Sequence, residues 1–390
     1  MSILKFDRPT LQLIMSTIGE GLTIVEQRND INSVAVRLDR RYGMSSISAS
    51  DTLTTELHTA SADLRQVDPL VGLFRFVTIG AIVIGLMALA WSVNNLFAFM
   101  AITAIAGIFY AFWIICSHDT VHYTLTGWPW FETILPRLTT WPMLWPYGTY
   151  TLLHRLHHGW NGIDLRDPER VQWTQAEYQR ANPILRWYVC HQGLLDMFVL
   201  GGIGLIFKTS IHGWKLRTVL PQLQRQFWLD LMGILTIQCG LLVFFSQRGE
   251  IGRYLLFWLI LERTIGAIAQ MRDRLEHYGM WGQTGGYQLT QLYACRNLDT
   301  YPGVGWLMGG LNYHAVHHAF PDIPFNRLPV AFERIQEVLQ RNGLPLMLQG
   351  KGYLHETIEL SRHPSTIGAV DPQDIRNRHY LLPLSRTESA

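Results

Sequence analysis

Three short motifs contain most of the histidines in the chain. They read HDTVH at 118–122, HRLHH at 154–158 and HAVHH at 314–318, and together they hold eight of the fifteen histidines. On a helix, residues three and four positions apart share a face, so each motif directs at least two ring nitrogens toward one point. This spacing is typical of metal ligands. Three such motifs in one chain favour a metal centre over a chance pattern.

The composition indicates what kind of elements position these motifs. Hydrophobic residues make up 48% of the 390 residues, charged residues make up 16%, and the mean hydropathy is +0.09. This apolar content is high for a soluble protein and predicts an all-α integral membrane protein. The net charge of +2, without a basic run that interleaves aromatic residues, gives no indication of a nucleic-acid partner. The four cysteines are widely spaced and predict neither a disulfide framework nor an iron–sulfur site.

Apolar segments predict four transmembrane helices, arranged as two hairpins. The first pair spans about 74–93 and 96–117 and turns at Asn94-Asn95. The second pair spans about 227–246 and 251–270. At 1.5 Å rise per residue and roughly 20 residues per crossing, each pair crosses the bilayer and returns. The motifs then lie just outside the membrane.

Two stretches between the pairs are expected at the membrane surface. Residues 123–153 contain four prolines among tryptophans and tyrosines. Prolines at that density break a spanning helix, and the aromatic residues favour the interface. Residues 184–207 carry Arg186 and Asp196, so we expect an interfacial or re-entrant helix there.

The charge distribution predicts the orientation. The two short turns together carry one basic residue, Arg248, whereas the loop between the pairs carries ten. These ten are Arg137, Arg155, Arg166, Arg170, Arg180, Arg186, Lys208, Lys215, Arg217 and Arg225. By the positive-inside rule this loop is cytoplasmic. We therefore expect a cytoplasmic helical cap that carries the histidine motifs, with both termini on the same side.

The last span is expected to deliver one more ligand. It contains Glu262 and Arg263, which are costly in lipid and by default point into the bundle or a wet cavity. The sequence favours neither a structural ion pair nor a functional role for these two residues. Residues 271–277 should continue the helix out of the membrane, which makes His277 a ninth candidate ligand and places Asp273 on the same face.

The number of candidate ligands predicts two metal ions. Neutral imidazole binds iron, zinc, copper and nickel, so ligand type alone does not select the metal. A structural or hydrolytic zinc uses three or four protein ligands, which is fewer than the sequence offers. The candidates are His118, His122, His154, His157, His158, His277, His314, His317 and His318. A pair of redox-active irons at a membrane surface suits the oxidation of an apolar substrate by O2.

These features closely resemble the membrane fatty acid desaturase and hydroxylase superfamily. The resemblance rests on the three motifs, on the two span pairs and on the run NYHAVHHAFP at 312–321, and it covers about residues 70–345. It implies a cytoplasm-facing di-iron centre, O2 as oxidant, and an external electron donor such as a ferredoxin or a cytochrome-type protein. It also implies a histidine ligand after the last span, which His277 matches. Acyl-CoA desaturases have an asparagine four residues earlier, so Asp273 is expected to assist the metal through water.

Acidic residues after the second motif add to this resemblance. Asp164 and Asp167 are similar to an acidic stretch of the family, which implies contacts on the substrate or donor side. The chain is expected to divide into an N-terminal segment (1–70), a membrane desaturase domain (71–345) and a C-terminal tail (346–390). Within the first segment, amphipathic patterns predict helices near 11–25 and after Asp51, packed on the membrane face or on the main domain.

The motifs favour O2-dependent desaturation of a fatty acyl chain, because HxxxH with two HxxHH motifs resembles acyl-lipid desaturases. An apolar substrate tunnel should then run from the membrane between the spans to the motifs. Carotenoid hydroxylation or ketolation is the alternative, since Tyr301-Pro302-Gly303 resembles carotene hydroxylases. A zinc-dependent membrane hydrolase or a metal transporter is a different class. A transporter would place its ligands at the bilayer midplane, whereas these motifs lie outside the spans.

Overall fold

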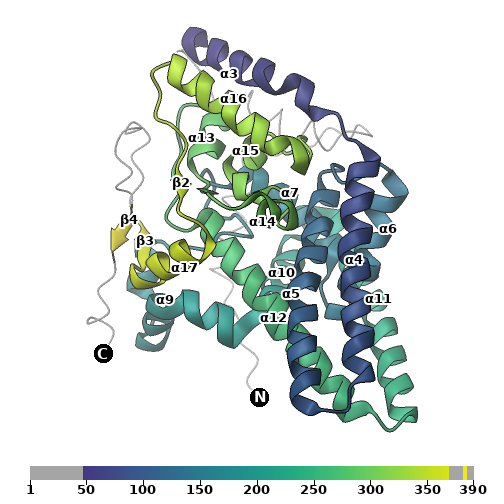
Figure 1. The fold of residues 1–390 in the computed structure, drawn as a ribbon. Coiled ribbons are helices and arrows are strands. Elements are labelled where there is room, and N and C mark those ends of the chain that lie inside the picture. Colours follow the sequence, from purple (N-terminus) through teal and green to yellow (C-terminus); the bar gives the residue numbers. More distant parts are fainter. Residues whose placement is uncertain (1–46, 369–380, 384–390) are drawn as a thin grey trace. The chain divides into compact units, whose positions relative to one another are not determined.

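A computed structural model describes residues 47–368 and 381–383 of the chain (Figure 1). The described residues are mostly helical, and the short strands form two sheets of two strands each. The predicted fold class is therefore correct at the level of a mostly helical protein. The amphipathic helix predicted near 11–25 lies outside the described residues.

The first predicted hairpin consists of α4 (Pro69–Ser92) and α5 (Leu96–Val121). Asp68 caps the first turn of α4 by accepting a hydrogen bond from the Leu70 amide, and Asn95 does the same for α5 through the Ala98 amide. The turn predicted at Asn94-Asn95 is confirmed. Because α5 continues four residues past its predicted end, the first motif lies on its last turn.

The second hairpin consists of α11 (Pro221–Gln247) and α12 (Ile251–His277). Helix α12 continues to His277, as the sequence predicted. It packs along α5 over much of its length, which joins the two hairpins and brings the ends of α5 and α12 together (Figure 1).

Between the hairpins the chain forms a series of shorter elements. These are α6 (Pro129–Thr140), η2 (Trp141–Met143), α7 (Tyr147–Trp160), α8 (Gln175–Arg180), α9 (Pro183–Leu195), the π-turn η3 (Asp196–Leu200) and α10 (Gly201–Leu216). Length and apolar character make Pro183–Leu216 a fifth candidate span, beside the four that were predicted. Helix α9 runs across the direction of α4 and α5 in Figure 1, and the chain bends after it at Gly201, with φ +55° and ψ −141°.

The ion pair of the last span fixes this bend. The buried Glu262 carboxylate accepts a hydrogen bond of 2.7 Å from the Ile203 amide, in the first turn of α10. Arg263 pairs with Glu262 and donates to the carbonyls of Val199 and Leu200, which end η3. The acid therefore binds one free amide at a helix start and the base binds two free carbonyls at a helix end. This contact gives Glu262 and Arg263 a structural role inside the apolar region.

We expect Gly266→Ala to lower the thermal stability of the detergent-solubilised protein. A Cβ at Gly266 would lie 1.8 Å from the Gly202 backbone nitrogen, so α10 and α12 would have to separate. Overpacking of this kind costs roughly 1–3 kcal/mol. The matched control is Gly252→Ala on the same helix, where no atom lies within 4 Å of the added Cβ. An equal loss in both variants would contradict this account of the packing.

The C-terminal part of the chain covers the ends of α5, α7 and α12. It contains α13 (Tyr287–Tyr293), β1 (Asn297–Leu298), α14 (Pro302–Leu307), η4 (Leu311–Tyr313), α15 (His314–Ala319), η5 (Phe325–Arg327), α16 (Leu328–Arg341), β2 (Gln349–Gly350), α17 (Tyr353–Arg362), β3 (Ser365–Ile367) and β4 (Leu381–Pro383). Strands β1 and β2 are parallel, with Asn297 paired to Gln349, and β3 and β4 are antiparallel, with Thr366 paired to Leu382.

A helix is present where one was predicted after Asp51, as α3 (Ile47–Ser61), and η1 (Ala62–Arg65) follows it. It begins earlier than predicted, so Asp51 lies inside the helix and does not start it. Its apolar face packs on α16, and buried Leu57 and Leu64 join a core with Phe320 and Ile335. This segment therefore packs on the main domain, one of the two positions expected for it, and covers α15, the helix of the third motif.

Candidate metal centre

All nine predicted histidines lie at the ends of four helices that meet in one place. The first motif closes α5, the second lies on α7, the third lies on α15, and His277 is the last residue of α12. Eight of the nine side chains are buried, and His122 is partly exposed. Segments that are far apart in the sequence therefore form a single histidine-rich interior.

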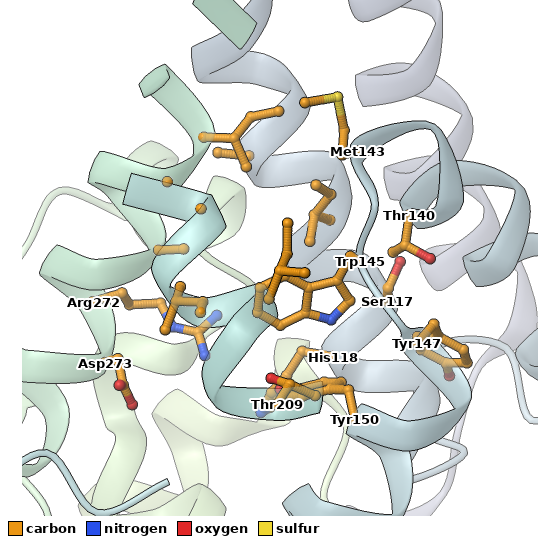
Figure 2. Close-up of a pocket in the computed structure, with 18 of the residues that line it drawn as sticks. Ser117, His118, Thr140, Met143, Trp145, Tyr147, Tyr150, Thr209, Arg272 and Asp273 are labelled. Carbon is orange, nitrogen blue, oxygen red and sulfur yellow. The ribbon is translucent and has the colours of Figure 1, made fainter. Parts of the chain in front are cut away.

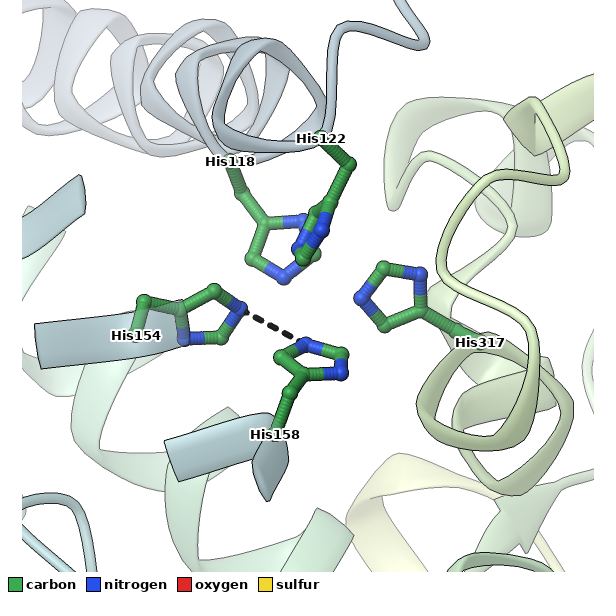
Figure 3. A group of neighbouring side chains, drawn as sticks. All are labelled: His118, His122, His154, His158 and His317. Atoms are coloured by element: carbon green, nitrogen blue, oxygen red, sulfur yellow. Dashed lines mark hydrogen bonds between the residues drawn. The ribbon is translucent and has the colours of Figure 1, made fainter. Parts of the chain in front are cut away.

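Five of the histidines form a first group. His118, His122, His154, His158 and His317 each offer a ring nitrogen, and these nitrogens all lie within 4.8 Å of one another (Figure 3). The Nε2 atoms of His154 and His158 are 3.1 Å apart. Nitrogens at right angles around one metal ion, each about 2.1 Å from it, are separated by about 3.0 Å. The spacing therefore fits two ligands of one ion.

The other four histidines form a second group. The Nε2 atom of His277 lies 3.0 Å from that of His314 and 3.2 Å from that of His157. His277, His314 and His318 also form a group within 4.8 Å that includes the Cys295 thiol. The rings of His158 and His318 stack with centroids 4.1 Å apart, so the two groups are adjacent.

Unpartnered ring nitrogens test whether these groups suit metal ions. The Nε2 atoms of His118, His122, His317 and His318 are buried and have no hydrogen-bond partner among the described residues. An unpaired buried nitrogen is unfavourable unless something binds it. Nine imidazoles in sets of five and four therefore fit two metal ions of the class that accepts nitrogen ligands, iron among them.

Carboxylates hold the outer nitrogens of two α7 histidines. The Nδ1 atom of His157 is 2.8 Å from Asp167, and that of His154 is 2.9 Å from Glu169. In metal sites such a partner accepts the Nδ1 proton, orients the ring and leaves Nε2 as the ligand. The sequence assigned Asp167 to the substrate or donor side, whereas the structure places it against a histidine. Glu169 was not predicted, and its only signal was an acidic residue close after the second motif.

Burial sets the charge of these imidazoles. It lowers the pKa of His158, His314, His317 and His318 well below the usual value, and neighbouring histidines lower each further. These rings are therefore neutral, which is the form that binds metals. His157 differs: burial lowers its pKa, but the Asp167 and Glu169 carboxylates outweigh burial and raise it to about 9.

Asp167→Asn is expected to weaken metal retention about 10–100-fold, the usual effect of removing such an outer carboxylate. The amide oxygen still accepts a hydrogen bond but carries no charge to polarise His157. Asp164→Asn is the matched control, because Asp164 lies in the same loop and pairs with Arg166 at 2.6 Å. Iron released by a chelator measures the effect. Equal release from the two variants would show that Asp167 does not support the site.

The two acids near the end of α12 differ in their surroundings. Asp273 belongs to neither histidine group, and its carboxylate lies 3.7 Å from the Lys208 ammonium. Glu276 was not predicted, yet one of its oxygens lies 3.4 Å from His314 Nε2 and the other lies 2.8 Å from Arg272. Of these two acids, Glu276 is therefore the one that contacts a histidine of the site.

A cavity between the spans leads to the first histidine group (Figure 2). Its apolar lining includes Ala111, Ile115, Met143, Leu205, Ile265 and Ile268, from α5, η2, α10 and α12. Figure 2 shows His118 near one end and Met143 away from it, with Trp145 between them. Lys208, Arg272 and Asp273 add charge near the histidine end. The apolar lining and the position between the spans agree with two features of the tunnel that the sequence predicted.

Comparison with known proteins assigns the chain to a family. The sequence model described as Fatty acid desaturase matches residues 71–350. The chain belongs to the fatty acid desaturase family. This confirms the resemblance that the three histidine motifs indicated.

Individual relatives match with lower coverage. The Delta(8)-fatty-acid desaturase of Euglena gracilis is 22% identical over 210 residues, 49% of each chain. The sn-1 oleoyl-lipid 12-desaturase of Picosynechococcus sp. is 23% identical over 284 residues, 69% of this chain and 65% of the relative. The Delta(5) fatty acid desaturase fat-4 of Caenorhabditis elegans is 37% identical over 62 residues, 16% of this chain and 14% of the relative. Each match spans less than two thirds of the relative's own length.

Proposed function

We propose that this chain is a membrane di-iron oxidoreductase that uses O2 to desaturate a fatty acyl chain. The observation that carries this proposal is the pair of histidine groups, five and four, of which the first is reached by an apolar cavity between the spans. In the reaction a CH2–CH2 pair, O2, two electrons and two protons give a CH=CH bond and two waters. The electrons come from a separate donor, a ferredoxin or a cytochrome-type protein.

Different residues of the protein hold the irons and bind the substrate. His118, His122, His154, His158 and His317 hold one iron, and His157, His277, His314 and His318 hold the other. When bound, the irons supply the oxidising power that an unactivated C–H bond requires, since such a bond has no acidic proton for a base to remove. The apolar lining binds the acyl chain and excludes water. His118 lines the cavity and belongs to the first group, so an acyl chain in the cavity lies close to that group.

We propose that four of the five candidate spans cross the membrane, with the histidines and both termini cytoplasmic. Helices α5 and α12 both end at the histidines, through His118 and His277, and α11 and α12 form a hairpin. If these helices cross, α11 begins on the side where α5 ends. The segment between them then crosses an even number of times, so Pro183–Leu216 does not make a single crossing. The basic central loop places that side in the cytoplasm.

Cysteine-accessibility labelling tests this arrangement. A cysteine introduced near Asn94 should react only from the outer side, and one near Gly162 only from the cytoplasmic side. The reverse pattern at either position would contradict it.

We further propose that the sequence divides into residues 1–70, 71–345 and 346–390. Helix α17 of the last segment packs on α9 and α12 of the second.

To test the function, the protein is expressed together with a ferredoxin and its reductase in a host that makes saturated acyl lipids and β-carotene. We expect new double bonds in the acyl chains and unaltered carotene. Oxygenated carotene with unaltered acyl chains would instead make the protein a carotenoid hydroxylase or ketolase. A host that carries the empty vector gives the baseline for both pools.

A further inference from the structure

A glutamine on α13 contacts two of the segments that carry histidines. Gln291 is fully buried, its Nε2 donates a hydrogen bond of 2.9 Å to the backbone carbonyl of Asn161, and its Oε1 lies 3.1 Å from His318 Nδ1. Asn161 is the C-cap of α7, the helix of the second motif. A backbone carbonyl can only accept, so the amide must present its oxygen to His318. The Nδ1 atom of His318 therefore carries the proton.

This tautomer leaves the other nitrogen of His318 free. Its Nε2 is buried and has no hydrogen-bond partner among the described residues, and it faces the second histidine group. A histidine binds a metal through the nitrogen that carries no proton, and the hydrogen bond at the other nitrogen decides which one that is. Gln291 thus prepares His318 to bind through Nε2.

Asn161 extends the same contact to a second ligand. Its Nδ2 lies 3.2 Å from both Gln291 Oε1 and Cys295 Sγ, and Cys295 Sγ lies 3.8 Å from His277 Nδ1. The opposite nitrogen of His277, Nε2, faces His157 and His314. The thiol therefore contacts the Nδ1 side of the His277 ring, while Nε2 faces the two other histidines. From there it acts on the orientation of the ring.

We propose that Gln291 is a positioning residue for the second metal ion, and that Asn161 and Cys295 support it. This inference rests on the proposed function, because it requires metal ions in both histidine groups. The first group has no contact with these three side chains in the hydrogen bonds of the described residues, and its His154 is held by Glu169 instead. Loss of the Gln291 contact therefore affects one metal ion and spares the other.

The test compares three variants of the full chain in detergent, loaded with ⁵⁷Fe(II). Gln291→Leu removes the contact, Gln291→Glu keeps an oxygen that accepts the His318 proton, and Gln288→Leu is the matched control. Gln288 lies on the same helix and contacts His58 at 3.2 Å, away from both groups. Chelator titration gives the affinity of each iron, and Mössbauer spectra separate the two sites.

We expect two irons in the wild-type chain. Gln291→Leu should weaken one of them about 10–100-fold and remove one Mössbauer component, whereas the other component stays unchanged. Gln291→Glu keeps an oxygen at His318 Nδ1 but loses the donor to the Asn161 carbonyl, so it should recover the second component only in part. Gln288→Leu should behave as wild type. Two irons of wild-type affinity in Gln291→Leu, or equal weakening of both irons, would each overturn the inference. A wild-type chain that binds no iron would overturn the proposed function itself.

Discussion

Replacing His158 with alanine is expected to abolish product formation while the protein still inserts into the membrane. His158 Nε2 lies 3.1 Å from His154 Nε2, and its ring stacks on His318 of the second group. The substitution removes a ligand from one group and a packing contact from the other. Outer-shell substitutions already cost about 10–100-fold, so we expect the loss of a ligand to exceed 100-fold. Gas chromatography of the acyl chains measures the product.

His191→Ala is the control for this experiment. His191 lies on α9, and its Nδ1 is 2.8 Å from the Trp187 carbonyl, outside both histidine groups. It should retain wild-type product levels and wild-type iron content. Membrane extraction with alkali should show both variants inserted, because neither residue contributes to the apolar faces of α4, α5, α11 and α12. Turnover by His158→Ala above a few per cent of the wild-type level would show that His158 is not a metal ligand.

The second large effect is expected from Arg75→Met, which should destabilise the whole protein. Arg75 is completely buried in α4 and pairs with Asp119 at 2.7 Å. It also donates to the carbonyls of Trp306 and Leu307 on α14, at 2.9 Å and 3.0 Å. Breaking a buried pair from one side leaves an uncompensated charge and costs about 3–5 kcal/mol. The melting temperature in detergent measures this cost.

Two comparisons identify the cause of that loss. In the double variant Arg75→Met with Asp119→Asn no buried charge is left alone, so stability should be partly recovered. Arg248→Met removes one partner of an exposed ion pair with Glu250, 3.3 Å long, and should change stability by less than about 1 kcal/mol. Because Asp119 also lies 3.4 Å from His118 Nδ1, the double variant should still lose iron affinity. Full stability of Arg75→Met alone would contradict this account.

Local patterns predicted the parts of the structure that depend on local chemistry. The uncharged runs and the Asn94-Asn95 turn gave both helices of the first hairpin and the position of the turn between them. Histidine spacing gave eight of the nine residues of the two groups, since residues three and four apart share a helix face whatever surrounds them. The ninth, His277, followed from the continuation of the last span. The apolar positions after Asp51 gave the helix α3 but left open whether it packs on the membrane face or on the main domain.

Contacts between distant segments could not be predicted in this way. Gln291 and Asn161 are 130 positions apart, and α13 is too short to show a periodic pattern. Asp273 shares a helix face with His277, yet its carboxylate lies beside Lys208 of α10, a contact that the spacing on α12 cannot reveal. The role of Glu262 and Arg263 depends on the bend at Gly201, and the glycines at 201 and 202 do not show which side chains that bend meets. Each of these contacts depends on how the helices pack.

Isotope labelling tests the central claim most directly. Membranes that contain the protein are supplied with reduced ferredoxin and ¹⁸O2. The masses of the acyl chains and carotenoids are then measured by mass spectrometry. Dehydrogenation predicts acyl chains that have lost two hydrogen atoms, carry no ¹⁸O and leave the label in water. Acyl chains or carotenoids that have gained ¹⁸O would contradict desaturation, because the bound oxygen would then have entered the product.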